Sequence, residues 1–366
     1  MEKCNVIYYN STLLKGGTDV YMLDLIRHID KEKFQVDVVI KDGDKVDEMM
    51  LLELESLGSK VFLAKGSFLK RMLYLRSFFK KNKNKYQVAH INATSQRAGI
   101  VAYFAKHNGE IGKIIFHSHM GGNDNGKSFF DKIGFKLMLK NASNFAACSS
   151  EAREFMFEKK ISDEKVLILN NSVDTAKFKF DKSVRQEMRD RYGLASEDVA
   201  ILHVGRFAEQ KNHKKLILIF NEYLKERPSA KLFLIGDGVL FDEVVDQVNE
   251  LEIGERVIFL RLQNNINEFM CMADCLVMPS IHEGLPIVAV EAQASDLPCV
   301  FSDAISREAK LIEDVSFVSL LASKSEWCKE INKNIKKDRK SNENLFKKLG
   351  FDKESSTKTI EELYLK

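Results

Sequence analysis

Two short polar segments in the second half of the chain carry residue types that can bind a phosphorylated substrate. In the first, Arg206 and Lys211 lie five positions apart in the sequence GRFAEQKN, which follows the apolar run Ala200–Val204. Two cations on either side of a strand-to-helix turn can converge on one diphosphate, because both donate charge-assisted hydrogen bonds to its oxygens. A solvated charged loop is the alternative interpretation of the same residue types.

The second segment, EGLPIVAVE at residues 283–291, has the pattern of a helix start that faces a ligand. Its proline fits a first helical turn, and Gly284 and Leu285 would leave free backbone N–H groups ahead of that turn. Residues 287–290 are all apolar, which predicts a buried helix and makes the carboxylate of Glu291 costly without a partner. Acidic residues bind ribose hydroxyls in nucleotide sites, so we expect this role for Glu291; a buried salt bridge is the alternative.

Two segments in the first half of the chain also follow apolar runs. Gly16 and Gly17 precede an expected helix, and paired glycines let backbone N–H groups approach a phosphate, although a flexible turn has the same composition. His117 and His119 alternate at the end of the apolar run at 113–116. This spacing could serve a metal pair, but no third ligand is near in the sequence, so binding of substrate hydroxyls or phosphate is the other interpretation.

Other motifs narrow the function class. No G-x-G-x-x-G follows the first expected strand of the sequence, which argues against a nicotinamide oxidoreductase. Gly236-Asp237-Gly238 predicts a tight turn that is compatible with a ligand site without specifying one. The six cysteines are scattered, as is typical of cytosolic thiols. Cys271 and Cys275 lack a matching Cys or His pair, so we interpret them as buried free thiols.

The elements that must position these residues alternate along the chain between strands and helices. Apolar runs that fit buried strands lie at 6–9, 36–40, 60–64, 88–92, 113–117, 144–149, 166–170, 200–204, 231–235, 256–260, 275–279 and 298–301. Helical stretches lie between them, for example at 18–29, 69–81, 95–107, 127–139, 214–227, 240–251 and 286–294. This alternation predicts parallel sheets covered on both faces. The pattern restarts after 174–182, so we predict an α/β architecture of two doubly wound domains.

Length and composition agree with this organisation. A chain of 366 residues exceeds the about 250–300 residues of a single core. No apolar run reaches the roughly 18–20 residues of a membrane-spanning helix, and the first residues lack a signal pattern, which predicts a cytoplasmic protein. The net charge is only +3, but residues 60–140 hold 16 basic and three acidic residues, which indicates an anionic partner.

In this order, the motifs resemble those of the retaining glycosyltransferases of family 4, the GT-B group that builds bacterial capsule, exopolysaccharide and lipopolysaccharide. The resemblance is carried by EGLPIVAVEAQASDLPCV after GRFAEQKN and GDG, by GGTDVYMLDL and HSH, and by NNSVDTAKF at the boundary. It covers nearly the whole chain and is most specific in the second half. It implies two Rossmann-like domains facing a cleft. These are an acceptor-side domain at 1–175 and a sugar-nucleotide-binding domain at 176–351, with a C-terminal helix at about 352–366 that can pack back on the first.

The resemblance assigns roles residue by residue. Arg206 and Lys211 match the positions that neutralise the donor diphosphate. Glu283 matches the first glutamate of the family motif, a catalytic position near the donor-sugar hydroxyls. The amides of Gly284 and Leu285 would face the sugar and phosphate.

For the remaining positions the resemblance implies nucleotide contacts and one histidine. Glu291 matches the second glutamate, which holds the ribose of the nucleotide. Gly16 and Gly17 match the glycine-rich loop beside the diphosphate. His117 is the first choice for the catalytic histidine of the family, and His119 is the second.

The implied reaction moves a sugar from a nucleotide-sugar substrate with retention of configuration. Charge grows on the leaving diphosphate, where cations and helix dipoles can stabilise it without a metal. The leaving phosphate can accept the proton of the acceptor, so we expect no cofactor, no metal and no protein base. UDP is the favoured nucleotide, although Arg261-Leu262 stand where the family commonly has glycine, in a loop that shapes the base pocket.

Related enzymes extend polyprenyl-diphosphate-linked glycans at the cytoplasmic leaflet, so the resemblance implies a glycan or lipid-linked acceptor. Residues 67–85 could form a basic amphipathic helix on anionic lipid, which would make the protein peripheral on the inner face of the membrane. An ordinary core-facing helix with a solvated basic face is the alternative, and no nucleic acid partner is expected. The segment combines Phe68, Leu69, Met72, Leu73, Leu75, Phe78 and Phe79 with Lys70, Arg71, Arg76, Lys80, Lys81, Lys83 and Lys85.

Two other functions fit the same scaffold. A sugar-nucleotide epimerase or a phosphorylase would form product without an acceptor or would require inorganic phosphate. A non-catalytic nucleotide-sugar-binding subunit would bind the nucleotide without hydrolysis or transfer.

Overall fold

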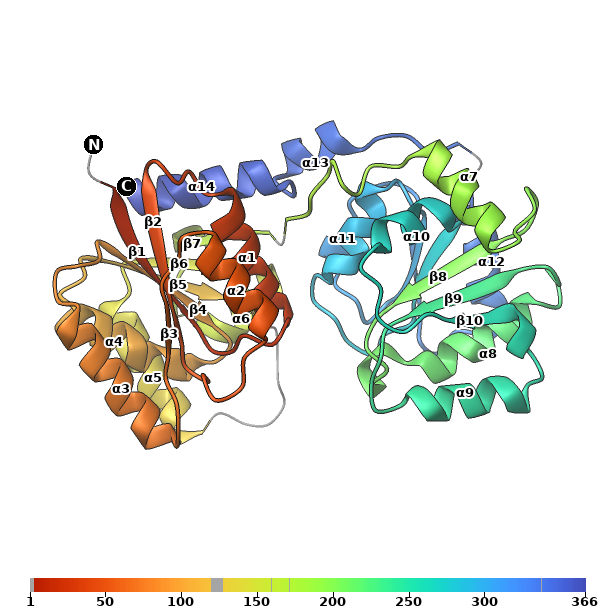
Figure 1. Cartoon of the computed structure of the whole chain (residues 1–366). Coiled ribbons are helices and arrows are strands. Elements are labelled where there is room, and N and C mark those ends of the chain that lie inside the picture. Colours follow the sequence, from red (N-terminus) through yellow and green to blue (C-terminus); the bar gives the residue numbers. More distant parts are fainter. Residues whose placement is uncertain (1–2, 120–127, 159, 171, 337) are drawn as a thin grey trace. The chain divides into compact units, whose positions relative to one another are not determined.

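The computed structural model describes residues 3–119, 128–158, 160–170, 172–336 and 338–366. The chain forms two compact units, one of Met1–Asn171 with Lys353–Lys366 and one of Ser172–Asp352. We call them the N-terminal and C-terminal units (Figure 1). The observed boundaries follow residues 171 and 352, where the sequence interpretation placed them after 175 and 351.

The N-terminal unit is built on a parallel seven-stranded sheet in the order β3-β2-β1-β4-β5-β6-β7. The strands are β1 (Cys4–Asn10), β2 (Phe34–Ile40), β3 (Val61–Leu63), β4 (Val88–Ala93), β5 (Lys113–Ser118), β6 (Asn144–Ala147) and β7 (Val166–Ile168). Its helices are α1 (Gly17–His28), α2 (Glu48–Ser56), α3 (Phe68–Lys81), α4 (Gly99–His107), α5 (Phe129–Asn141), α6 (Ser150–Phe157) and α14 (Lys353–Leu365).

The C-terminal unit repeats the plan with a parallel six-stranded sheet in the order β10-β9-β8-β11-β12-β13. The strands are β8 (Ala200–Val204), β9 (Lys231–Ile235), β10 (Val257–Phe259), β11 (Cys275–Met278), β12 (Cys299–Ser302) and β13 (Val315–Val318). The helices are α7 (Lys182–Arg191), α8 (His213–Tyr223), α9 (Phe241–Glu250), α10 (Ile266–Met272), α11 (Ile287–Ala294), α12 (Lys324–Asn334) and α13 (Glu343–Leu349).

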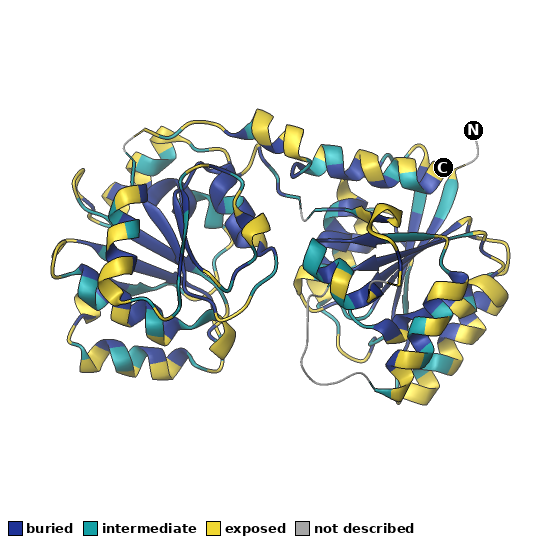
Figure 2. Ribbon diagram, turned by 180° about the vertical axis from the view of Figure 1, so that it is seen from behind, coloured by how far each residue is buried: buried dark blue, intermediate teal, exposed yellow. Residues whose placement is uncertain are grey.

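Both sheets are buried on both faces, which explains why their strands read as continuous apolar runs. In β1, Val6 packs into one core of the N-terminal unit, while the next residue, Ile7, packs into the core on the opposite face. Leu276 and Val277 of β11 divide in the same way between the two cores of the C-terminal unit. Figure 2 shows the buried strands enclosed by helices whose outer faces are exposed. The predicted α/β architecture of two doubly wound domains is therefore confirmed.

The last helix returns to the N-terminal unit and packs against α1 (Figure 1). Its Tyr364 hydroxyl lies 2.7 Å from Nδ1 of His90 in β4, and Lys353 forms an ion pair with Asp24 of α1 at 2.9 Å. The side chain of Glu361 accepts a hydrogen bond from the backbone N–H of Asp30. These polar contacts hold α14 on the N-terminal unit, although the element directly before it in the sequence is helix α13 of the other unit.

A buried ion-pair cluster joins α7 to the sheet of the C-terminal unit. Asp274, just before β11, accepts hydrogen bonds from Arg185 and Arg189 of α7 and from the backbone N–H of Ala200. The side chains of Arg189 and Asp274 are 5% and 8% exposed, so neither charge is solvated well without the other. Removing one partner of such a pair costs more than the pair contributes, because the remaining charge stays buried.

We therefore predict that Asp274→Ala lowers the free energy of unfolding by about 3–5 kcal/mol. Urea denaturation followed by circular dichroism would measure the loss. Glu243→Ala is the matched control, since it removes a carboxylate from the exposed Lys214–Glu243 ion pair, which solvent screens. Equal stability of the two variants would contradict this account of the Asp274 cluster.

Candidate active site

The turn between β8 and α8 presents the two predicted diphosphate-binding cations differently. Arg206 is exposed and makes no ion pair within the part of the chain that the structure describes. Lys211 lies in a short 3₁₀ helix (Glu209–Lys211), and only 17% of its side chain is exposed. Asn212 then begins α8 in the left-handed region, with φ = 55°. The turn therefore offers one free guanidinium and one half-buried ammonium.

The ammonium of Lys211 is bound by Glu283, although 72 residues separate the two in sequence. Nζ of Lys211 lies 2.7 and 2.9 Å from the two carboxylate oxygens of Glu283. The hydroxyl of Ser280 donates a further hydrogen bond to Oε1 at 2.6 Å. Because the Glu283 side chain is only 9% exposed, this pair is nearly closed to solvent. The structure thus brings together two residues to which the sequence assigned separate ligand contacts.

Backbone and side-chain hydrogen bonds hold the two predicted segments next to each other. Ile281 donates its N–H to the carbonyl of Gln210 at 2.8 Å, and the Gln210 side chain donates to the carbonyl of His282 at 2.8 Å. The amide of Asn212 donates to the carbonyl of Pro279 at 3.0 Å. The loop after β11 and the turn after β8 are therefore joined by three hydrogen bonds.

The loop after β11 leads into α11, where the sequence prediction needs one correction. Pro286 is the N-cap rather than a residue of the first turn, and Ile287 is 36% exposed, so the helix start is not buried on all sides. Glu291 is half-buried, which removes the argument that its carboxylate is enclosed by the core. The amides of Gly284 and Leu285 make no backbone hydrogen bond within the described ranges, as a helix start that binds an anion requires.

A pocket of about 760 Å³ opens where β8, β9 and β10 end. Its walls include Gly205 and Arg206 from the β8 turn, Gly236 to Gly238 from the β9 turn, and Leu262 from the β10 loop. A Cβ atom on Gly236 would lie 2.0 Å from the carbonyl oxygen of Gly205, so only glycine lets the two turns approach this closely. The tight turn that the sequence indicated without a role thus forms a wall of the pocket.

Arg261 adopts the left-handed conformation, with φ = 53°, which is unusual for an arginine. Its guanidinium lies 3.3 Å from the centre of the Phe241 ring and donates a hydrogen bond to Asp237 at 2.8 Å. The same carboxylate oxygen accepts from the N–H of Gly238 at 2.8 Å. Arg261 therefore occupies a position that a glycine would take without strain and braces the β9 turn.

In the N-terminal unit, the glycine pair begins α1, with Gly16 as the N-cap and Gly17 as the first helical residue. The buried carboxylate of Asp19 holds the loop by accepting from the N–H groups of Leu14 and Gly16 at 2.7 and 3.0 Å. A Cβ atom on Gly17 would meet nothing within 4 Å, so the space beside it is open. A ligand could approach the helix start there.

The two histidines at the carboxyl end of β5 are His117, within the strand, and His119, just after it. The ring of His117 is fully buried, and its Nδ1 lies 3.2 Å from Nε2 of His90. Burial, together with the charges of His119 and His90, lowers the pKa of His117 well below its usual value, and burial lowers that of His119 to about 3. Both rings are neutral at pH 7. His119 is half-buried as a residue, but its Nε2, like that of His117, is buried without a hydrogen-bond partner in the described structure. Burial therefore does not decide between the two, and the assignment of either stays a prediction.

The described residues include no cluster of side chains that could bind a metal ion. No group of three or more His, Cys, Asp or Glu residues there has the arrangement that would hold an ion. The six cysteines are free, and Cys271 and Cys275 are buried, as predicted.

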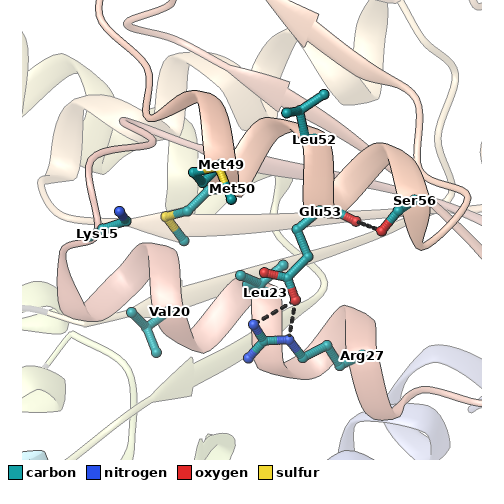
Figure 3. Close-up of a pocket in the computed structure, with 9 residues that line it drawn as sticks. All are labelled: Lys15, Val20, Leu23, Arg27, Met49, Met50, Leu52, Glu53 and Ser56. Carbon is teal, nitrogen blue, oxygen red and sulfur yellow. Dashed lines mark hydrogen bonds and ion pairs between the residues drawn. The ribbon is translucent and has the colours of Figure 1, made fainter. Parts of the chain in front are cut away.

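A second pocket, of about 630 Å³, lies between α1 and α2 (Figure 3). Apolar side chains line it, among them Leu23 of α1 and Met50 of α2. Ion pairs bridge the two helices at both ends of the pocket, Lys15 to Asp47 at 2.9 Å and Arg27 to Glu53 at 2.6 Å. The cations of this groove are therefore already neutralised.

Sequence reasoning missed several residues that shape the site. His203 of β8 is buried, its Nδ1 lies 2.8 Å from the carbonyl of Val277, and burial lowers its pKa to about 4. Ser280, Asn212 and Gln210 join the two segments as described above. The position of Asn212 just before an expected helix was a signal for a cap, but nothing in the sequence indicated their partners.

Two family models together match most of the chain. The model "Glycosyltransferase Family 4" matches residues 15–177, and the model "Glycosyl transferases group 1" matches residues 184–348. Each match falls almost entirely within one of the two units.

Curated relatives agree with these matches. A protein of Bacillus subtilis (strain 168) that is named as the glycosyltransferase EpsF is 32% identical over 339 residues, which cover 89% of this chain and 86% of that protein. The UDP-Gal:alpha-D-GlcNAc-diphosphoundecaprenol alpha-1,3-galactosyltransferase of Escherichia coli is 23% identical, with coverage of 82% of this chain and 80% of that enzyme.

Solved structures share the fold over the whole chain. The Anabaena protein Alr3699/HepE, crystallised with UDP and glucose, superposes with a TM-score of 0.78 at 18% identity and covers 98% of each chain. TarM superposes with a TM-score of 0.74 at 11% identity. With two Rossmann-like units and a relative that is 32% identical over most of its length, the chain belongs to glycosyltransferase family 4 and has the GT-B fold.

Proposed function

We propose that the protein transfers a sugar from a nucleotide-sugar donor, with UDP as the favoured nucleotide, to a polyprenyl-diphosphate-linked glycan with retention of configuration. The observation that carries this proposal is the arrangement around the turn after β8. Arg206 lies free beside the pocket, next to a turn that is tied to the loop carrying Glu283 and the open amides of Gly284 and Leu285.

Sugar transfer requires stabilisation of the leaving diphosphate, and this arrangement offers groups that can supply it. As the glycosidic bond to the diphosphate breaks, negative charge grows on the leaving oxygens. Arg206 can donate to those oxygens, and the start of α11 adds its free N–H groups and helix dipole. Lys211 can exchange part of its contact with Glu283 for phosphate, which frees the carboxylate for sugar hydroxyls. The leaving phosphate can then accept the proton of the acceptor hydroxyl on the same face.

Names of related proteins support the classes of donor and acceptor. HepE was crystallised with UDP-glucose, and the Escherichia coli relative is named for a UDP-galactose donor and a diphosphoundecaprenol-linked acceptor. A Campylobacter jejuni relative, 31% identical over 157 residues, is also named for a diphospho-undecaprenol-linked acceptor. On this basis we extend both classes to the present chain.

Arg206→Ala should lower transfer by about 100- to 1000-fold, because it removes one donor that stabilises the developing charge, worth about 2–4 kcal/mol. The variant should keep the melting temperature of the wild type, since Arg206 is exposed and unpaired in the described structure. Nucleotide release from UDP-sugars, with and without acceptor, would measure the rate.

Lys211→Ala is the informative companion variant. It should lower both the transfer rate and the melting temperature, because it leaves the Glu283 carboxylate nearly buried without its cation. Wild-type transfer in both variants would overturn the assignment. Nucleotide binding without hydrolysis or transfer in the wild type would indicate a non-catalytic subunit.

Metal independence is the second expected property. Two cations and a helix start provide the charge stabilisation that a divalent ion would otherwise supply. Transfer should therefore proceed at full rate in excess EDTA. A loss of activity on chelation that Mn²⁺ restores would contradict this expectation.

We also propose that the protein associates with the inner face of an anionic membrane through α3. Leu75, Phe78 and Phe79 of this helix face the core, as the alternative interpretation required, but Leu69 and Leu73 are 68% and 56% exposed. No helix in the described ranges is long and apolar enough to cross a bilayer. Association would therefore rest on the surface of the unit.

Charge on α3 further supports this association, and the contacts select which lysines to test. Lys83 and Lys85 form ion pairs with Glu110 and Asp37, whereas the helix residues Lys70, Arg76, Lys80 and Lys81 make none in the described structure. Phe129 and Phe130, exposed at the start of α5, extend the surface, because the Phe68 and Phe130 rings lie 5.9 Å apart.

Changing Lys70, Arg76, Lys80 and Lys81 to Gln should abolish co-sedimentation with anionic vesicles, because each basic residue near the surface contributes about 1 kcal/mol. Lys83→Gln, which breaks an existing ion pair, should have a much smaller effect and serves as the control. Binding of the wild type should weaken steeply with salt and be absent with neutral vesicles. Equal sedimentation of the wild type and the quadruple variant would refute the membrane role of α3.

A further inference from the structure

Lys41 is a half-buried cation at the carboxyl edge of the N-terminal sheet. It follows the last residue of β2, and its N–H donates to the carbonyl of Asn10 in β1. Its ammonium makes no hydrogen bond or ion pair within the described part of the chain. Solvent still reaches this ammonium, but burial of the side chain removes part of its hydration, a cost that an anionic ligand would offset.

The surroundings of Lys41 increase that cost. Burial lowers the pKa of Lys41, the carboxylate of Asp42 raises it, and the guanidinium groups of Arg71 and Arg97 lower it further. Hydrogen bonds support the same proximity. Asp42, the residue after Lys41, pairs with Arg71 and donates its N–H to the carbonyl of Ser11 at 2.9 Å, so the end of β2, α3 and the end of β1 meet here.

Protein carboxylates already engage both arginines. Arg71 of α3 pairs with Asp42 at 2.8 Å and Asp44 at 2.6 Å, and Arg97, just after β4, pairs with Asp131 at 3.1 Å. Both contacts of Arg71 use Nη2, while Nε is buried without a partner and Nη1 makes no hydrogen bond in the described residues. Three carboxylates thus stand beside the three cations, but none of them forms an ion pair with the ammonium of Lys41 in the described residues, and Arg71 retains an unused donor.

Hydroxyl groups stand at the same edge of the sheet. Ser11 follows β1 and Thr94 follows β4, the strand on the other side of β1, and their hydroxyl oxygens lie 3.4 Å apart. Ligands of open α/β sheets bind at this edge. The edge therefore combines cations and hydroxyls in the way that phosphate sites do.

The apolar surface of α3 and α5 begins beside the same arginines. Phe68 and Leu69 lie one turn before Arg71 and are 48% and 68% exposed. Phe129 and Phe130 stand next to Asp131, the partner of Arg97, and are 72% and 48% exposed. A ligand whose diphosphate met the cations could place an apolar chain along these rings.

We propose that Lys41, with Arg71 and Arg97, forms a binding site for the diphosphate of a lipid-linked acceptor. The inference rests on the proposed function, which supplies the class of acceptor, but the site belongs wholly to the N-terminal unit. The groove between α1 and α2 is the weaker candidate, because Asp47 and Glu53 already neutralise its cations.

Titration calorimetry on the full chain would test the site with farnesyl diphosphate, inorganic diphosphate and farnesol. Saturating UDP keeps the probes from the donor site, and the same titrations on Arg206→Ala check that it does. Wild type should bind farnesyl diphosphate, and Lys41→Gln should bind it about tenfold or more weakly, as for loss of a charged hydrogen bond. Lys45→Gln is the matched control, since Lys45 lies exposed in the same loop, and it should bind within about twofold of wild type.

The other probes identify what the site binds. Lys41→Gln should weaken inorganic diphosphate by a similar factor and leave any binding of farnesol unchanged, which assigns the contact to the diphosphate. Tighter binding of farnesyl diphosphate than of inorganic diphosphate would assign the site to a lipid-linked ligand. Equal affinities would instead mark it as a site for free diphosphate, which would refute the acceptor assignment.

Stability separates a ligand-binding lysine from a structural one. The melting temperature of Lys41→Gln should equal or exceed that of the wild type, because the change removes an unpaired, half-buried charge. A clear fall in melting temperature, unchanged farnesyl diphosphate affinity in Lys41→Gln, or no binding by the wild type would each overturn the proposal. If the wild type consumes no nucleotide sugar, the proposed transferase function fails, whether or not the probes bind.

Discussion

The ion pair between Lys211 and Glu283 is the contact on which the candidate donor site depends. It joins the turn after β8 to the loop after β11, two segments that the sheet order places side by side because β8 and β11 are neighbouring strands. Around it, hydrogen bonds from Gln210 and Asn212 fix the same two segments. The pair keeps both charges compensated when no ligand is bound, so the site can be preorganised without leaving a buried charge alone.

Because Lys211 is paired with Glu283, the two cations Arg206 and Lys211 differ in how they can contact a ligand. Arg206 has no protein partner in the described structure and lies on the pocket wall, so a ligand meets it without breaking any contact. Lys211 must give up part of its bond to Glu283 before it contacts phosphate. The two cations that the sequence treats as equivalent therefore differ in what their removal costs the folded protein.

The sequence was sufficient to predict the architecture because the strands are buried on both faces and read as unbroken apolar runs. The exception is β13 (Val315–Val318), a four-residue edge strand in which Ser316 interrupts the pattern and polar residues flank both ends. Helix starts were predictable from local composition, as at Gly16 and Gly17. Long-range partners were not, since no local pattern indicates that Lys211 would meet Glu283 or that His203 would be buried beneath the same turn.

Burial is the property that sequence composition misjudged most often. Residues 287–290 suggested an enclosed helix with Glu291 inside it. Six of the eight residues of α11 are buried, but Ile287 and Glu291 lie four positions apart on the one stripe that is not, so Glu291 is half-buried. His117 was expected to contact a ligand at a strand end, but its ring is fully buried against Tyr21 and His90. Successive residues of a strand point to opposite faces of the sheet, so the sequence can assign His117 to a face but does not show which side chains cover that face.

Each of the two units has a cation without an ion pair at the carboxyl edge of its sheet, among the residues that the structure describes. These cations are Arg206 in the C-terminal unit and Lys41 in the N-terminal unit. The cations near them form ion pairs: Lys211 with Glu283, Arg71 with Asp42, and Arg97 with Asp131. A fold tolerates such a group only if exposure or a ligand supplies the missing interaction. Arg206 is exposed and costs little, whereas Lys41 is half-buried and costs more, so the argument for a bound anion is stronger at Lys41, a residue to which the family resemblance assigned no role.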